Sequence, residues 1–372
     1  MTGGVTVRPV VSAADLKRFI AFPYAHYRGD PQWVPPLRMD VSKLLSKKKN
    51  PFFQHGDAEY FLAERNGTVV GRIAAIENDA HNSFHEERIG FFGFFESIND
   101  QAVASGLLDA AADWLRPRKL TAMRGPASLS TNDECGLVVE GFDAPPTILT
   151  PYTPPYYIDL VEGAGFAKAK DLLMYQTVDN RLPEHLVKRV QRVAERQNIT
   201  LRHLDMKRFD EEVEHIKGVY NSAWEKNWGF VPMTDAEIDH MAKDMKPVVV
   251  PELIVFVEKD GEVIGFAAAL PDLNVALKTN PSGRLFPGIL KILWAARKVN
   301  RIRILLLGLK KEYRRTGADV LMYHWIWDKG WELGHRWAEA GWILEDNAPM
   351  NNGIQRLGFG HYKTLRLYER PL

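Results

Sequence analysis

The stretch that decides the fold joins an apolar run to a charged turn and a helical pattern: Leu305-Leu306-Leu307-Gly308-Leu309-Lys310-Lys311-Glu312-Tyr313-Arg314-Arg315-Thr316-Gly317-Ala318-Asp319. The apolar run predicts a strand, and the residues after Thr316 predict a helix. A strand–turn–helix junction of this kind presents unpaired backbone N–H groups at the positive end of a helix dipole. We therefore expect this turn to suit a phosphate or pyrophosphate.

A second segment follows at a spacing that leaves room for one helix. The run Trp342 to Asn347 predicts a strand, and residues 348–357 predict a short helix that ends at Gly358-Phe359. Together the two segments resemble the core of the GNAT superfamily of acyl-CoA-dependent N-acyltransferases. The first family pattern, Arg or Gln, two residues, Gly, one residue, Gly or Ala, is similar to Arg314 to Asp319. The second, Asn followed eleven residues later by Gly-Phe, is matched by Asn347 and Gly358-Phe359. The resemblance covers about residues 205–370.

The resemblance implies a donor and a set of residues that bind it. The donor would be acetyl-CoA or another acyl-CoA, with its pyrophosphate on the backbone N–H groups of residues 315–319 and its pantetheine along the preceding strand. Gly317 also has a physical reason for its place, because a residue without Cβ lets the backbone approach a ligand closely. The alternatives are a plain glycine at a helix start and a solvated turn for the two arginines. The expected cofactor-binding residues are Leu307, Leu309, Arg314, Arg315, Thr316, Gly317, Ala318, Asp319 and Asn347.

Two positions depart from the family pattern. Asp319 stands where the family has Gly or Ala, and its carboxylate either repels a phosphate or points away as a residue of the first helical turn. Ile354 stands where the family usually has a Tyr that protonates the departing thiolate. Another group or solvent would then supply that proton.

Two carboxylates on the second strand are candidates for the general base. Glu339 lies among apolar residues in mid-strand, so it must be either paired or functional. Glu345 ends the strand where the acyl group is expected to arrive. A structural salt bridge is the alternative for both, and for Asn347 the alternative is a helix cap.

The expected acceptor is the amine of a small molecule or a peptide. Trp224, Asn227 and Trp228 follow a predicted helix in a region that borders the acceptor site in GNAT folds, and Asp272 and Asn274 leave a predicted hairpin on the opposite side. Core packing is the alternative for the tryptophans.

The chain of 372 residues suits two domains. Asn66-Gly67 and Asp260-Gly261 each separate two apolar runs and predict hairpins, and the similar phrases at 68–75 and 262–269 indicate a duplicated architecture. We predict an α/β (α+β type) fold of two tandem GNAT-like domains, each a twisted, mostly antiparallel sheet flanked by helices. The expected ranges are 1–180, a helical linker at 181–204, and 205–372. Asp100 stands at the phosphate loop of the first domain, which is therefore expected not to bind CoA.

Composition limits the remaining functions. Lys+Arg (48) and Asp+Glu (47) nearly cancel, so no nucleic-acid partner is expected. The single cysteine, Cys135, excludes an internal disulfide, and no metal-binding motif is present. The N-terminus does not resemble a signal peptide, and no apolar run reaches the ~18 residues of a membrane span. We expect a cytoplasmic protein without stable membrane insertion, and a homodimer is plausible.

Three alternatives to an N-acyltransferase stay open. A non-catalytic GNAT-like module that binds a small molecule or partner would be favoured by Asp319 and Ile354. Transfer of an aminoacyl group from tRNA predicts a basic groove. Peripheral membrane binding would use the basic, apolar segment 285–303, which otherwise packs as an ordinary helix and strand.

Overall fold

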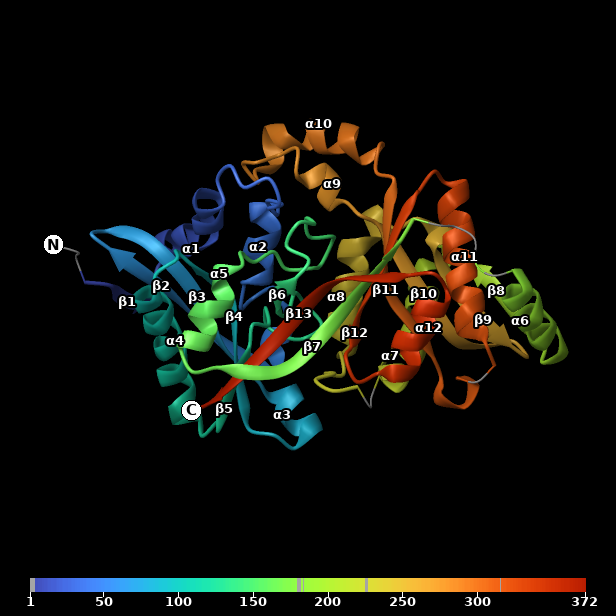
Figure 1. Cartoon of the computed structure of the whole chain (residues 1–372), viewed down its shortest axis with the longest axis horizontal. Coiled ribbons are helices and arrows are strands. Elements are labelled where there is room, and N and C mark those ends of the chain that lie inside the picture. The colour runs from blue at the N-terminus through green and yellow to red at the C-terminus, as the bar shows by residue number, and fades with distance from the viewer. Residues whose placement is uncertain (1–3, 179–181, 183, 225–226, 315) are drawn as a thin grey trace. The chain divides into compact units, whose positions relative to one another are not determined.

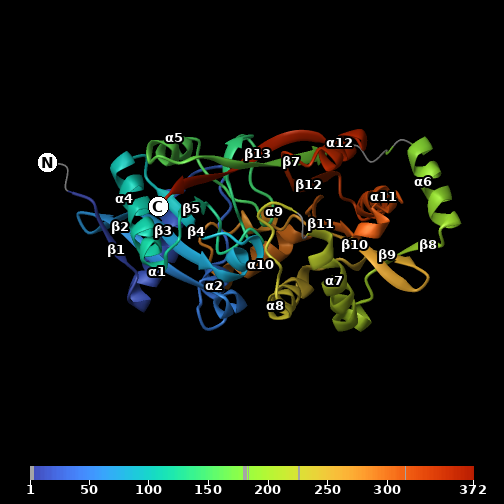
Figure 2. The same cartoon turned by 90° about the horizontal axis from the view of Figure 1, so that it is seen from below.

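The chain folds into two compact units that exchange segments along the sequence (Figures 1 and 2). The computed structural model describes residues 4–178, 182, 184–224, 227–314 and 316–372. Unit 1 comprises residues 1–172, 274–297 and 363–372, and unit 2 comprises residues 173–273 and 298–362. Two segments from the second half of the sequence thus belong to unit 1, whereas the sequence predicts one uninterrupted C-terminal domain over 205–372. The predicted linker contains a helix, α6 (Glu184–Arg196), that belongs to unit 2.

Unit 1 is a mixed sheet with a helix on each face. Its elements in chain order are β1 (Thr6–Pro9), α1 (Ala13–His26), α2 (Arg38–Leu44), β2 (Gly56–Arg65), β3 (Thr68–Asn78), α3 (Asp79–His85), β4 (Ile89–Ser97), α4 (Gln101–Leu115), β5 (Ala122–Gly125), β6 (Leu137–Glu140) and α5 (Tyr156–Gly163), followed later by α9 (Asn274–Leu277) and α10 (Leu285–Ala296). Two long strands, β7 (Ala167–Thr177) and β13 (Gly360–Pro371), contribute residues to both units. Strands β1 to β4 pair antiparallel in sequence order, and β4 pairs parallel with β5.

Side-chain alternation explains how the sheet of unit 1 is covered. Phe61 and Ile73 face the apolar stripe of α4, whose Leu107 and Leu108 are fully buried. The neighbouring residue on β2, Tyr60, points to the other face and contacts Phe19 of α1. Figure 2 shows α4 and α1 on opposite sides of these strands.

Unit 2 repeats this plan. Its further elements are β8 (Ile199–His203), α7 (Phe209–Trp224), α8 (Asp235–Met245), β9 (Ile254–Lys259), β10 (Glu262–Pro271), β11 (Arg301–Leu309), α11 (Ala318–Glu332), β12 (Trp337–Leu344) and α12 (Ala348–Arg356). Strands β8 to β11 pair antiparallel, and β11 pairs parallel with β12. Val255 and Val257 pack in the cluster that includes α11 and α6, whereas Ile254 and Phe256 pack in the cluster that includes α7 and α8.

The predicted hairpins are confirmed by their turns. Asn66 and Gly67 have φ values of 51° and 77°, and Asp260 and Gly261 have φ values of 51° and 83°. Two consecutive positive φ values are what a type I′ turn requires, and Asn-Gly and Asp-Gly adopt them readily. The predicted fold class is likewise confirmed, with a mixed sheet and flanking helices in each unit.

Candidate active site

The site is built on the place where two parallel strands of unit 2 stop pairing. The ladder of β11 and β12 runs from Arg301 opposite Trp337 to Ile304 opposite Ala340, and within the described residues of both strands it goes no further. The next residue of β11, Leu305, is a β-bulge, because Ala268 pairs with Leu306 while Ala269 pairs with Ile304. Beyond the bulge, β11 carries only leucines and one glycine. β12 therefore does not pair with the backbone of β11 beyond Ile304, and the side chains along this part of β11 are apolar.

Unit 1 contains the same combination of a β-bulge and a parallel ladder that ends. The parallel ladder of β4 and β5 ends at Phe91 opposite Arg124, and β4 then has an extra residue opposite β3. Phe94, in this bulge, has a φ of 49°. The two units therefore share a bulge and a parallel ladder that ends, as well as the hairpins from which the duplication was predicted.

Helix α11 begins where β11 leads out of the sheet, as the sequence predicts. Gly317 is its N-cap residue and has a φ of 79°, which is the left-handed region that favours glycine. The close approach here comes from the protein itself, because an added Cβ would lie 2.8 Å from Cγ1 of Val190 on α6. Arg314 donates to the carbonyl of Ala223 at 2.7 Å, and Arg315 lies outside the described residues.

Two of the backbone N–H groups predicted to hold a pyrophosphate donate within the chain. The N–H of Thr316 donates to the carbonyl of Tyr313 at 3.2 Å. The N–H of Ala318 donates to Oγ1 of Thr316 at 3.4 Å. Asp319 follows in the first turn of α11. Burial raises the pKa of its carboxyl, and the neighbouring backbone N–H groups partly oppose the rise.

Replacing Gly317 with alanine tests the packing at this turn. We expect the free energy of unfolding to fall by about 2–4 kcal/mol, because the left-handed backbone costs ~1–2 kcal/mol and overpacking against Val190 adds ~1–2 kcal/mol. Gly334→Ala is the matched control, since Gly334 has a φ of 93° but nothing within 4 Å of its added Cβ. Urea titrations of both variants separate the two contributions. Equal losses in both would show that α6 does not pack on Gly317.

Of the two candidate bases, Glu339 is fully buried and paired. Its Oε1 lies 3.1 Å from Nε of Arg303, and the hydroxyl of Tyr362 donates a hydrogen bond to Oε2. Arg303 also donates to the carbonyl of Gly341 at 3.1 Å, which is the first residue of β12 beyond the shared ladder. These contacts form the structural salt bridge that the sequence left open as the alternative to a general base at Glu339. Glu345 is exposed and follows the end of β12.

Three more of the predicted cofactor-binding residues take part in capping, packing or strand pairing. Asn347 accepts a hydrogen bond from the N–H of Met350 at 3.3 Å and caps α12. Leu309 is buried, and Gly265 leaves room for it, because an added Cβ would lie 2.4 Å from Cδ2 of Leu309. Leu307 is half-buried and pairs with Ala267.

The five predicted acceptor residues come from two segments of the chain. Trp224 ends α7, and Asn227 and Trp228 lie half-buried in the turn that follows. Asp272 is buried in unit 2, whereas Asn274 belongs to unit 1, where it donates to the carbonyl of Pro146 at 3.0 Å.

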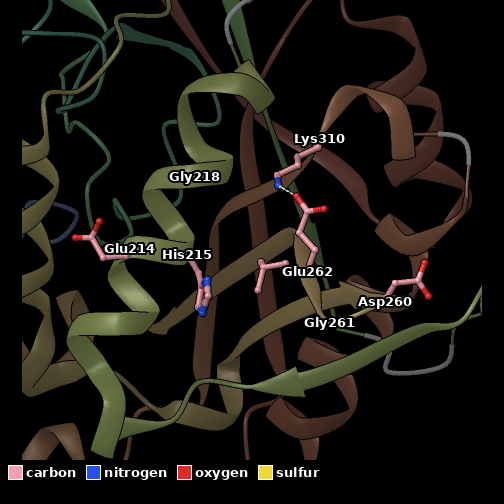
Figure 3. Close-up of a pocket in the computed structure, with 8 residues that line it drawn as sticks. Glu214, His215, Gly218, Asp260, Gly261, Glu262 and Lys310 are labelled. Carbon is pink, nitrogen blue, oxygen red and sulfur yellow. Dashed lines mark hydrogen bonds and ion pairs between the residues drawn. The ribbon is translucent and has the colours of Figure 1, made fainter.

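A surface pocket of about 370 Å³ in unit 2 lies between α7 and the β9–β10 turn (Figure 3). Its lining residues are Glu214, His215, Gly218, Asp260, Gly261, Glu262, Val263 and Lys310. Lys310 is paired with Glu262, and the other charged side chains are carboxylates. This acidic balance does not suit a phosphate-bearing donor, so we assign the pocket no part in donor binding.

A polar cluster that the sequence analysis missed lies beyond the bulge of unit 1. Glu96 of β4 accepts hydrogen bonds from the hydroxyls of Tyr27 and Tyr157, the latter at 2.8 Å, and lies 3.6 Å from Nη2 of Arg72. Nε2 of His26 lies 3.1 Å from the hydroxyl of Tyr156. Burial raises the pKa of the Glu96 carboxyl. A carboxylate near the end of an apolar, aromatic strand was the one signal in the sequence, because the tyrosines come from distant segments.

The position of this cluster corresponds to the bulge of unit 2. Glu96 pairs with Arg72 directly after the bulge of β4, just as Leu306 pairs with Ala268 directly after the bulge of β11. Unit 1 thus carries titratable groups where unit 2 carries apolar ones. Such a cluster can bind a protonated amine or exchange a proton.

The pKa of His26 gives a pH dependence. Burial lowers its pKa to about 4, so the folded protein favours the neutral ring, while the unfolded chain binds a proton near pH 6.5. The contribution of His26 to stability is therefore present above about pH 6.5 and is lost as the pH falls toward 4. We expect the unfolding midpoint of His26→Gln to depend less on pH than that of the wild type in this window. Parallel curves would contradict the assignment.

Among the described residues, no group of three or more His, Cys, Asp or Glu is placed to hold a metal ion. Nor does any helix within the described ranges have the length and apolar character needed to cross a bilayer.

Comparison with solved structures shows that the chain has the GNAT fold. A tandem GNAT protein from the clavulanic acid biosynthesis pathway superposes with a TM-score of 0.57 at 13% identity, covering 99% of this chain and 98% of that one. A GCN5-related N-acetyltransferase from Sphaerobacter thermophilus gives 0.53 at 12% identity, covering 99% and 95%. These likenesses show the fold.

Sequence comparison defines the family more narrowly. The chain is 40% identical to bacterial ceramide synthase from Caulobacter vibrioides, over 99% of this chain and 98% of that protein. It is 36% identical to Protein YghO from Escherichia coli K12, over 98% and 95%. The chain therefore belongs to the family of these two proteins. No family model matches it.

Proposed function

We propose that the protein is an acyl-CoA-dependent N-acyltransferase that acts on a long-chain amino alcohol. The observation that carries this proposal is the 40% identity to bacterial ceramide synthase over nearly the whole of both chains. A ceramide is the amide of a fatty acid and a long-chain amino alcohol, so its synthesis is N-acylation. The apolar residues of β11 beyond the bulge suit a fatty acyl group at least as well as an acetyl group.

In this proposal the donor binds at the junction of β11 and α11. The uncovered edge of β11 beyond Ile304 supplies main-chain groups to the pantetheine and to the thioester carbonyl. The N-terminus of α11 would receive the pyrophosphate, with the charge of the Asp319 carboxylate in its first turn opposing the binding. An acyl-CoA supplies the activated acyl group, and the amine attacks its carbonyl and releases CoA thiol.

The general base that we propose is Glu345. A base for an amine must return its proton to solvent, and Glu345 is exposed at the end of β12, whereas Glu339 is enclosed with Arg303 and Tyr362. We expect Glu345→Gln to lower kcat by ~10²–10⁴-fold, the range of general base catalysis, with little change in stability.

A second candidate for the reaction centre is the Glu96 cluster of unit 1, favoured by its place beyond the equivalent bulge. Glu96→Gln keeps the shape of the side chain and tests it directly. Loss of turnover in Glu96→Gln but not in Glu345→Gln would place the chemistry in unit 1.

The proposed activity is tested with purified protein, a long-chain amino alcohol and a series of acyl-CoAs from acetyl to palmitoyl. We expect an N-acylated product by mass spectrometry and stoichiometric release of CoA thiol, with long acyl donors favoured. Saturable binding of acyl-CoA without turnover on any amine would overturn the proposal and support the non-catalytic binding module.

A further inference from the structure

Helix α10 has its large apolar side chains on the outside. Leu290, Leu293 and Trp294 are 73%, 56% and 61% exposed, and their spacing of three and four residues places them on one helical face. Phe286, at the start of the helix with extended backbone, is 75% exposed. In a helix that only packs on a protein core, the large apolar side chains face that core.

The inward face of α10 is made of small residues. Gly288 and Ala295, two turns apart, are its buried residues. An added Cβ at Gly288 would lie 2.4 Å from Nδ2 of Asn280, so the glycine lets the helix lie directly on the segment after α9. Figure 1 shows α10 beside α9 at the rim of unit 1. The usual distribution of small and large apolar residues between surface and core is reversed in this helix.

The segment that carries α10 is basic. Residues 274–297 contain four basic residues and no acidic one, in a chain whose charges otherwise nearly cancel. Lys278, Arg284, Lys291 and Arg297 are all exposed. Lys291 borders the apolar face on the side of Trp294, so a second copy of the same face would bring like charges close together.

The helix is held in place by the body of unit 1. The N–H and Nε of Arg38 donate to the carbonyls of Gly283 and Ser282 at 2.9 Å and 2.8 Å, just before the helix. An added Cβ at Gly283 would lie 2.3 Å from the ring of Tyr24 on α1. The exposed face is therefore presented on a fixed support.

We propose that α10 docks unit 1 onto an anionic lipid surface. An exposed row of Leu, Trp and Phe with Lys and Arg at its sides matches the apolar boundary and the charged headgroups of such a surface. The helix of 12 residues lies in the interface and does not span the bilayer. This goes beyond the proposed function and does not rest on it, although a lipidic acceptor would be found on the same surface.

Co-sedimentation of the full chain with vesicles tests the proposal. We use vesicles of phosphatidylcholine alone and with about 30% phosphatidylglycerol. The wild type is expected to pellet with the anionic vesicles, less so as salt is raised. The double variant Leu290→Asn, Trp294→Asn is expected to lose ~10²-fold or more in partitioning, because two large apolar groups leave the interface. Lys291→Gln, Arg297→Gln is expected to lose ~10-fold or more for anionic vesicles and little for neutral ones.

Val11→Asn, Leu333→Asn is the matched control, since these residues are 81% and 47% exposed and lie away from α10 in the sequence. It should pellet like the wild type. Equal thermal unfolding of all variants checks that the fold is intact. The proposal is overturned if the wild type stays in the supernatant with anionic vesicles, or if the α10 variant pellets as the wild type does. It is also overturned if the α10 variant converts a lipid-free dimer to a monomer, since a second copy would then be the occupant.

Discussion

Replacing Glu339 with leucine is expected to lower the free energy of unfolding by about 3–5 kcal/mol. The carboxylate is fully buried, and its partner Arg303 is 3% exposed, so the substitution leaves a guanidinium in the interior without its counter-charge. The hydroxyl of Tyr362 loses its acceptor as well. Equilibrium unfolding in urea measures the loss, and we expect a lower midpoint at an unchanged slope.

Two further variants show whether the missing charge is the cause. Arg303→Met with Glu339→Leu removes both charges and should recover most of the lost stability, because a buried pair can be replaced by apolar residues of similar volume. Glu332→Leu removes one partner of the Lys329–Glu332 pair, in which Glu332 is 58% exposed, and should change stability by less than ~1 kcal/mol. If the double variant is as unstable as Glu339→Leu, lost packing rather than charge explains the effect.

Replacing Asp319 with asparagine is expected to tighten binding of acyl-CoA by about tenfold. The wild-type carboxylate lies in the first turn of α11 and places a negative charge beside the helix terminus where the pyrophosphate is proposed to bind. A charge at a helix terminus contributes up to ~2 kcal/mol, and 1.4 kcal/mol corresponds to tenfold in affinity. Calorimetry with a nonhydrolysable acyl-CoA analogue measures the change.

The pH dependence supplies a second readout for the same residue. Burial raises the pKa of Asp319 above its usual value of 3.8, so lowering the pH neutralises the carboxyl and should strengthen donor binding by the wild type but not by Asp319→Asn. Asp328→Asn, an exposed residue later in α11, is the control for removing one negative charge. Weaker binding by Asp319→Asn than by the wild type would mean that the carboxyl helps to hold the donor.

The local patterns of the sequence predicted most of the fold. The Asn-Gly and Asp-Gly turns and the strand–helix order from β11 to α12 depend on neighbouring residues, and the structure confirms them. Helices α2, α3 and α5 were missed. Exchange of segments between units could not be predicted, because the packing of residues 274–297 in unit 1 depends on distant groups such as Tyr24 and Arg38.

For the candidate site, the sequence predicted the glycine at the start of α11, but it could not show that Val190, more than a hundred residues earlier, packs on that glycine. Mid-strand burial of Glu339 indicated a partner without identifying Arg303 and Tyr362. The Glu96 cluster was missed because its tyrosines, Tyr27 and Tyr157, are far from it in sequence.

The route of β13 has a consequence for biosynthesis. Its residues from Lys363 onward belong to unit 1, where Tyr368 is fully buried opposite Gly125 of β5 and Leu365 pairs with Val138 of β6. These residues leave the ribosome only after the whole of unit 2 has been synthesised. The sheet of unit 1 therefore stays incomplete, with apolar surface exposed, until the synthesis of unit 2 is finished. Chaperones that protect nascent chains would be needed over that interval, and expressing residues 1–180 alone should yield an aggregating fragment rather than a domain.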